Sequence, residues 1–159
     1  MNRRYTIDEF EEIVQRLRRY YDDVILTTDI IVGFPGETEN EFKETFDFLT
    51  KIKFYKMHIF KYSPRKGTKA ESMEKQVSGD MKELRSKKLL ELSDENENEY
   101  LDTYIGKDVE VLFEEKDGEF YKGHTANYIM VKYKTEENLE NKLKTVKITG
   151  KENLSLISD

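Results

Sequence analysis

The 159-residue chain contains no cysteine. This absence excludes disulfides, a thiol nucleophile, thiolate metal sites and any iron–sulfur cluster ligated by the chain itself. The sequence also lacks an apolar run near the roughly 18 residues that span a bilayer, and it lacks a secretory signal. We therefore expect a soluble, cytoplasmic protein with no membrane partner.

The chain also has few hydrophobic residues, and its net charge is negative rather than positive. Only 36% of the residues are hydrophobic, 38% are charged, and the net charge is −6. A chain of this length makes one large domain or two small ones, with a modest core that 10 tyrosines and 9 phenylalanines help to fill. The acidic balance argues against bulk affinity for nucleic acid, so any RNA contact must be local.

Helix and strand patterns alternate in the first half of the chain. Capping boxes at Thr6–Glu9 and Thr38–Glu41 each predict a helix start. The β-branched run 24–34 and the run 55–62 predict strands, which a crossover helix makes parallel, the first buried on both faces. Two such strands leave edges and faces uncovered. We therefore interpret residues 1–77 as the C-terminal part of a larger α/β domain; a small stand-alone α/β unit is the alternative.

The second half changes from an acidic helix to short strands. Residues 78–104 predict a linker helix, which Ser93-Asp94 would permit to break because Asp is a poor helix former. In residues 105–159, Asp117-Gly118 is a hairpin signal. Five short strands in about 50 residues predict a small all-β, closed barrel of the OB type.

The stretch Lys53–Lys69 holds six cationic side chains and no acidic one, interleaved with four aromatic residues. It reads as a strand that ends in a basic loop at Ser63-Pro64. Such a patch suits an anionic ligand such as a phosphate, a carboxylate or RNA. An edge strand kept soluble by lysines is the alternative.

Three features near the strands bear on a site. Asp29 lies in an apolar run, so we expect it to be paired or to point into a polar cavity. The turn Gly33–Gly36 follows a parallel strand at the end where ligands bind in α/β folds, although plain turn chemistry explains it equally. His58 is a strand histidine, a position that is more often structural than catalytic.

A second basic strip falls in the strand-rich region. Three lysines and one acid lie between residues 119 and 135. OB-type barrels bind single-stranded nucleic acid through stacking and backbone contacts, whereas a solvated strand face is the alternative. The residues expected to bind RNA are Lys122, His124, Asn127, Tyr128 and Lys132.

Three stretches follow one another in the chain: MNRRY (1–5), TTDIIVGFPGET (27–38) and HIFKYSPRKGTKA (58–70). In this order they resemble segments of the MiaB-like tRNA methylthiotransferases of the radical S-adenosylmethionine (SAM) class. The region 105–159, centred on YKGHTANYIMV, resembles the C-terminal TRAM domain of that family. The resemblance implies that residues 1–77 are the C-terminal part of a radical SAM βα barrel.

The resemblance also implies a reaction. In that family a [4Fe-4S] cluster cleaves SAM to a radical that abstracts hydrogen from C2 of an adenosine beside the anticodon of tRNA. A second [4Fe-4S] cluster supports sulfur insertion, and another SAM supplies a methyl group. The cluster cysteines belong to family regions that precede Met1. The fragment itself is therefore expected to be inactive, with no catalytic or metal-binding residue, and to retain a cavity wall for SAM and a tRNA-binding domain.

By position in the family motifs, Arg3 would hold the SAM carboxylate and the Tyr62–Arg65 loop would face SAM or the target nucleotide. The residues that would line the adenosyl pocket are Ile31, Val32, Gly33 and Phe34. The third motif, with Met73 and Gln76-Val77 downstream, is most similar to the branch acting on threonylcarbamoyladenosine. The alternatives are a methylthiotransferase acting on isopentenyladenosine, a non-catalytic RNA-binding adaptor with a TRAM/OB module, and a purely structural interaction protein.

Overall fold

The structure is a computed structural model that describes residues 4–159. Its first element is helix α1. It spans Ile7–Tyr20 and starts at the predicted capping box. Thr6 Oγ1 accepts a hydrogen bond from the Glu9 N–H at 3.2 Å, and Glu9 Oε2 accepts one from the Thr6 N–H at 2.7 Å. These reciprocal bonds satisfy N–H groups that a helix start leaves without partners. The predicted helix start is confirmed.

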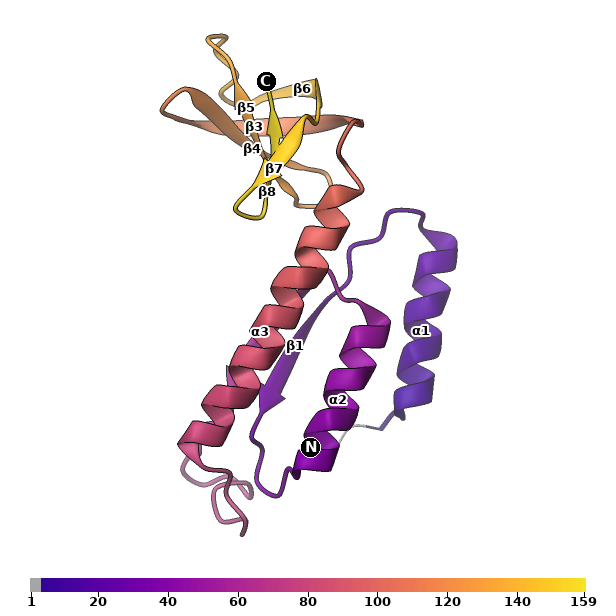
Figure 1. Ribbon diagram of the computed structural model, residues 1–159, viewed down its shortest axis with the longest axis vertical. Coiled ribbons are helices and arrows are strands. Elements are labelled where there is room, and N and C mark those ends of the chain that lie inside the picture. Colours follow the sequence, from indigo (N-terminus) through magenta and orange to yellow (C-terminus); the bar gives the residue numbers. More distant parts are fainter. Residues whose placement is uncertain (1–3) are drawn as a thin grey trace. The chain divides into compact units, whose positions relative to one another are not determined.

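Two parallel strands flank the second helix. β1 (Thr27–Val32) pairs in parallel with β2 (Lys56–Lys61). Helix α2 (Glu39–Ile52) connects them and begins at the second predicted capping box, formed by Thr38 and Glu41. Figure 1 shows α1 and α2 running side by side, and Lys51 of α2 forms an ion pair of 2.7 Å with Glu11 of α1. The predicted parallel βα arrangement is confirmed.

One hydrophobic core joins α1, α2, the two strands and the first part of helix α3 (Gly79–Asp102). The Phe10 ring lies 6.2 Å from that of Phe48 and 6.1 Å from that of Phe54, which ties α1 to the end of α2. Burial of such apolar surface is the main stabilising contribution to this unit. The buried members are Val14, Val32, Phe42, Leu49, Ile52, Phe54, Met57, Leu89 and Leu92.

The opposite face of the two-stranded sheet is exposed. In β1, Asp29 and Ile31 are exposed while Val32 is buried, and in β2 the exposed residues include His58 and Phe60. Successive side chains of a strand point to opposite faces, and the core elements pack against one face only. The expectation that the first strand is buried on both faces is therefore wrong for the described residues.

Helix α3 continues without a break through Ser93. Ser93 is 4% exposed, and its Oγ accepts a hydrogen bond of 3.0 Å from the N–H of Met57 in β2. This tertiary contact offsets the low helix propensity of the SDENEN segment, so the break that the sequence permitted does not occur. The chain divides within α3 into a first unit that ends at Asn96 and a second unit, Glu97–Asp159. Across residues 4–159, no helix is both long and apolar enough to cross a membrane.

The second unit is all-β after the end of α3. The predicted hairpin at Asp117-Gly118 is confirmed, with Asp117 paired to Phe120. The structure has six strands where five were predicted, because β7 was missed, and Leu154 lies in the turn before β8 with φ of +58°. The strands are β3 (Asp108–Asp117), β4 (Phe120–Thr125), β5 (Met130–Lys134), β6 (Lys142–Lys147), β7 (Gly150–Glu152) and β8 (Ser155–Ser158).

These strands form one sheet in the order β6-β3-β4-β5-β8-β7. Only β5 and β8 pair in parallel. The predicted closed barrel is not seen, since within residues 97–159 no ladder joins β6 to β7. Instead, the linking residues bond to other segments: the Ile148 N–H donates to Lys107 O and the Thr149 N–H to Ile157 O, at 2.9 and 2.8 Å.

Candidate ligand cavity and nucleic-acid surface

A cavity of about 570 Å³ lies where β1 and β2 end. This volume falls within the usual range for small-molecule sites. Three residues selected from the sequence line it together, namely Ile31, Tyr62 and Arg65. They converge because the C-terminal ends of parallel strands meet at one edge of a sheet. Ser63, within the Tyr62–Arg65 loop expected to face the ligand, also lines it, and the lining residues that the sequence did not point to are Phe60, Lys61, Thr68 and Ala70.

The strand register explains why Phe60 belongs to the cavity. Ile31 lies opposite Phe60. Two residues earlier in each strand, Asp29 lies opposite His58. All four side chains are on the exposed face, so the alternation of the two strands carried the signal once their register was known. Asp29 is not buried, and the desolvation cost that motivated its expected pairing therefore does not arise.

The other residues expected to bind SAM border the cavity without lining it. Val32 is 2% exposed and faces the core, while its carbonyl accepts a hydrogen bond of 2.9 Å from the Tyr62 N–H. Gly33 is buried with φ of +72°. The Phe34 ring meets the Tyr62 ring edge-on at 5.3 Å. Arg3 lies outside the described residues.

The chemistry of the cavity suits a ligand with an apolar ring and an anionic group. Ile31 and Phe60 provide apolar surface, and Ser63 provides a hydroxyl. Of the two cations, Lys61 forms an ion pair of 2.6 Å with Glu83. Among residues 4–159, Arg65 forms no salt bridge, so its guanidinium can bind a carboxylate or phosphate. The same residues contain no group of three His, Asp or Glu side chains that could hold a metal ion.

The predicted RNA-binding strip occupies one face of the sheet in the second unit. Lys122 of β4 lies opposite Lys132 of β5, and His124 follows on the same side of β4. Carboxylates offset much of this positive charge. The Lys122 Nζ lies 2.6 Å from Asp117 and the Lys132 Nζ lies 3.6 Å from Glu152.

A hydrogen bond between Lys122 and Asp117 shifts the pKa of both groups. The hydrogen bond from Lys122 lowers the pKa of Asp117, and the same bond raises the pKa of Lys122. His124 Nδ1 lies 2.6 Å from Glu114 Oε2. No local pattern of residues pointed to these partners, because Glu114 and Glu152 approach the strip only through strand pairing.

Asn127 and Tyr128 lie in the tight turn between β4 and β5. Thr125 Oγ1 donates a hydrogen bond of 2.6 Å to Asn127 Oδ1, and Asn127 Nδ2 donates one of 2.9 Å to the Tyr104 hydroxyl. Tyr128 adopts φ of +66° and is 85% exposed, with its ring 6.2 Å from that of His124. Asn127 therefore anchors the turn, whereas Tyr128 presents an aromatic ring to solvent.

Comparison with known proteins agrees with the resemblance read from the motifs. Residues 1–49 match the model of the radical SAM superfamily. The tRNA-2-methylthio-N(6)-dimethylallyladenosine synthase of Acetivibrio thermocellus is 40% identical over 159 residues, covering 98% of this chain and 33% of the relative. The threonylcarbamoyladenosine tRNA methylthiotransferase MtaB of Bacillus subtilis is 39% identical over 153 residues, covering 93% and 34%.

A further relative extends this similarity. The tRNA-2-methylthio-N(6)-dimethylallyladenosine synthase of Aquifex aeolicus is 39% identical over 157 residues, covering 98% of this chain and 36% of the relative. The chain therefore spans about a third of the length of the curated relatives that it matches. The match to these proteins extends through both units of the fold.

Proposed function

Because this chain belongs to the MiaB-like tRNA methylthiotransferases of the radical SAM superfamily, we propose that it serves in methylthiolation of C2 of an adenosine in tRNA. In this proposal the first unit forms a wall of the cavity for SAM and the target nucleotide, and the second unit binds tRNA. The observation that carries the proposal is the cavity at the ends of β1 and β2, which gathers Ile31, Tyr62 and Arg65 in a chain with this ancestry.

The residues of the cavity fit SAM. Arg3 stays the proposed holder of the SAM carboxylate, and the Arg65 guanidinium of the loop that faces the ligand would make a second contact with this carboxylate, which its planar fork favours. Ile31 and Phe60 would contact the adenine ring, and burying such apolar surface would favour binding. When bound, SAM would supply the methyl group and the source of the radical. The chain's own residues bind it, orient it and exclude water on one side.

The residues present do not fit an iron–sulfur cluster. The clusters of this family are held by cysteine thiolates, and the chain has no cysteine. We therefore assign no step of the reaction to a cluster ligand of this chain. The two [4Fe-4S] clusters of the proposed enzyme would be held by protein regions that this sequence does not contain.

The second unit would act as a TRAM domain of OB-like type that grips tRNA. Lys122 and Lys132 would exchange their carboxylate partners for backbone phosphates, which releases counterions and makes binding sensitive to salt. Tyr128 would stack on an unpaired base, a contact that tolerates any base because each has an aromatic face. His124 and Asn127 would complete the surface. His124 would lie at its edge, and Asn127 would hold the turn.

For the substrate we propose N6-threonylcarbamoyladenosine. The supporting features are the His58–Phe60 form of the third motif and the similarity to the Bacillus subtilis relative. The two relatives named for dimethylallyladenosine match equally well, so the isopentenyl type of adenosine is the second candidate. Binding of this chain to anticodon stem-loops that differ only in this modification separates the two, and tighter binding of the dimethylallyl form would reverse the assignment.

The SAM-binding role is tested by calorimetric titration of the chain with SAM. Arg65→Ala should weaken binding by about tenfold or more, since the loss of one charge-assisted hydrogen bond costs roughly 1.5–3 kcal/mol. Lys66→Ala is the matched control, because it removes a neighbouring cation of the same loop that does not line the cavity. Equal losses of SAM affinity in both variants would mean that the loop acts only as a nonspecific cationic patch. Equal binding by all three proteins would refute the role of Arg65.

A further inference from the structure

We propose that Lys82 and Arg85, in the first two turns of α3, are positioning residues for the SAM cavity. The inference rests on the proposed function and deepens it. Neither residue lines the cavity. Each instead contacts the backbone or the turn at the ends of the two strands that form it. The segment expected from the sequence to be a linker helix would thus set the shape of the site.

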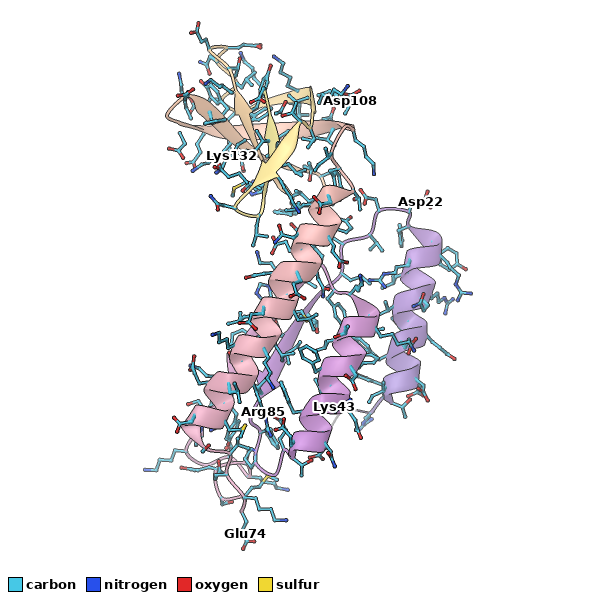
Figure 2. The ribbon with its side chains drawn as sticks, in the orientation of Figure 1. Asp22, Lys43, Glu74, Arg85, Asp108 and Lys132 are labelled. Atoms are coloured by element: carbon cyan, nitrogen blue, oxygen red, sulfur yellow. The ribbon has the colours of Figure 1, made fainter. Side chains whose placement is uncertain are left out.

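Arg85 is a buried cation held in a fixed geometry (Figure 2). Its side chain is 5% exposed, and its Nη1 donates to Glu37 Oε1 at 2.5 Å and to the Glu37 carbonyl at 3.3 Å. Nη2 donates to Glu39 Oε2 at 3.2 Å, and the guanidinium lies over the Phe42 ring at 5.2 Å. A buried arginine is costly unless its donors are paired, so this constellation defines one position for Glu37.

Glu37 passes this constraint on to the end of β1. Its second carboxylate oxygen, Oε2, accepts a hydrogen bond of 3.0 Å from the Gly33 N–H. The Glu37 N–H in turn donates to the Phe34 carbonyl at 2.9 Å. The turn that leaves β1 is therefore closed by Glu37, and Arg85 fixes Glu37 from a helix 48 positions later in the chain.

Lys82 connects the ends of the two strands directly. Its aliphatic stem covers Gly33 so closely that a Cβ at that position would lie 2.3 Å from Lys82 Cγ. Its Nζ donates a hydrogen bond of 3.1 Å to the Tyr62 carbonyl and lies 5.2 Å from the centre of the Tyr62 ring. One side chain therefore sets the spacing between Gly33 and Tyr62, and Tyr62 lines the cavity.

Stability alone does not require this arrangement. Apolar side chains of similar volume commonly replace buried ion pairs without loss of stability. The Arg85 Nε is also buried without a hydrogen-bond partner among the described residues, which is a further cost of keeping the guanidinium. What the polar groups provide, and apolar ones cannot, is a directed contact to the Gly33 N–H through Glu37 and to the Tyr62 carbonyl.

The test measures SAM affinity and amide hydrogen exchange on the same variants of the full chain. The variants are Arg85→Met, Arg85→Lys and Lys82→Met, with Lys87→Met as the matched control on an exposed position of α3. Arg85→Met and Lys82→Met should speed exchange of the Gly33 and Tyr62 amides by about tenfold and weaken SAM binding by a similar factor, because small displacements of positioning groups are costly. Exchange of the Ile30 amide, within β1, should stay unchanged. Arg85→Lys should fall between Arg85→Met and the unmodified chain, because it keeps the charge and loses the fork.

Each outcome of these measurements decides whether the positioning role holds. If the unmodified chain binds SAM and the variants bind it equally well, the positioning role is overturned while the proposed function stands. If the unmodified chain does not bind SAM, the proposed SAM site fails together with the positioning role. Should Arg85→Met unfold, Lys82→Met decides alone. Equal acceleration of Gly33, Tyr62 and Ile30 would show general loosening of the fold and would also overturn the inference.

Discussion

Ile31 and Phe60 lie directly opposite each other in the parallel register of β1 and β2, and both line the cavity at the strand ends. They are 38% and 54% exposed and form a continuous apolar surface. Apolar residues that adjoin Arg65, a cation without a salt bridge among residues 4–159, suit a ligand with an aromatic ring and a negative charge. This pair supports the proposal that the cavity holds the adenine of SAM.

Phe60→Ser should weaken SAM binding by roughly 1–2 kcal/mol, because an exposed ring that stacks on the ligand loses that contact. The thermal midpoint should hardly change, because the ring is half exposed without ligand. Tyr20→Ser, at a residue 73% exposed on α1, is the control and should change neither quantity. Calorimetry and circular dichroism measure the two. A drop in the midpoint without a loss of affinity would contradict the assignment.

Gly33→Ala should destabilise the first unit more than Gly36→Ala does. Both glycines have positive φ, at +72° and +87°, so both substitutions carry a backbone cost of about 1 kcal/mol. Only at Gly33 would the new Cβ meet Lys82, and such overpacking adds roughly 1–2 kcal/mol. Urea denaturation measures the difference. Equal losses would mean that Lys82 does not cover Gly33 in solution.

Tyr128→Asn should raise the stability of the second unit while it lowers RNA affinity. Asn tolerates the left-handed backbone of this turn better than Tyr, a gain of a few tenths to about 1 kcal/mol. Loss of one base-stacking contact should cost roughly 1–3 kcal/mol of binding. Thermal denaturation and filter binding of single-stranded RNA measure the two effects. Unchanged RNA affinity would remove Tyr128 from the proposed surface.

Lys122→Glu combined with Lys132→Glu should abolish tRNA retention at low salt, whereas Asp117→Asn combined with Glu152→Gln should strengthen it. The second pair frees both lysines from their carboxylates, leaving them available for phosphates. Loss of two phosphate contacts should reduce the slope of log affinity against log salt by about 2. Lys87→Glu with Lys88→Glu on α3 changes the net charge equally and is the control. Equal loss in both lysine pairs would indicate a nonspecific charge effect.

The capping box of α2 predicts a pH dependence. Hydrogen bonds from the Thr38 N–H and hydroxyl lower the pKa of Glu41. A carboxyl group whose pKa is lower in the folded state than in the unfolded state contributes stability above the unfolded value, about 4.3, and this contribution is lost as pH falls through the folded value. Thr38→Ala should therefore raise the pKa of Glu41 in an NMR titration and reduce the loss of stability in acid. Because the Thr38 N–H bond to Glu41 remains in this variant, an unchanged pKa would mean that the Thr38 hydroxyl does not bond Glu41 in solution.

Local signals predicted much of the fold. Thr6 and Thr38 marked two helix starts because capping uses residues three apart in sequence, and Asp117-Gly118 marked a hairpin for the same local reason. Contacts between distant residues were not predictable in this way. The bond from the Met57 N–H to Ser93 joins α3 to β2, and the absence of a ladder between β6 and β7 within residues 97–159 likewise depends on contacts between distant residues.

In the candidate site too, some residues were predictable from the sequence and others come together only in the folded chain. Ile31, Tyr62 and Arg65 were predictable because strand ends in α/β folds meet at one edge. Val32 was assigned to the pocket from its motif, yet the strand's alternation turns it into the core. Arg85 gave no signal, since only the fold brings α3 to Glu37. The acids that pair with Lys122 and Lys132 became visible only through strand pairing.

The most direct test of the account is a chimera. The segment of the Bacillus subtilis MtaB that matches this chain is replaced by the chain itself, so that the rest of the relative would supply the cluster cysteines that the proposal places outside this sequence. Mass spectrometry of nucleosides from tRNA incubated with the chimera, SAM and a sulfur source should detect a 2-methylthio group on threonylcarbamoyladenosine, and the same chimera with Arg65→Ala should produce much less. A soluble, cluster-loaded chimera that leaves every adenosine unmodified would contradict the account.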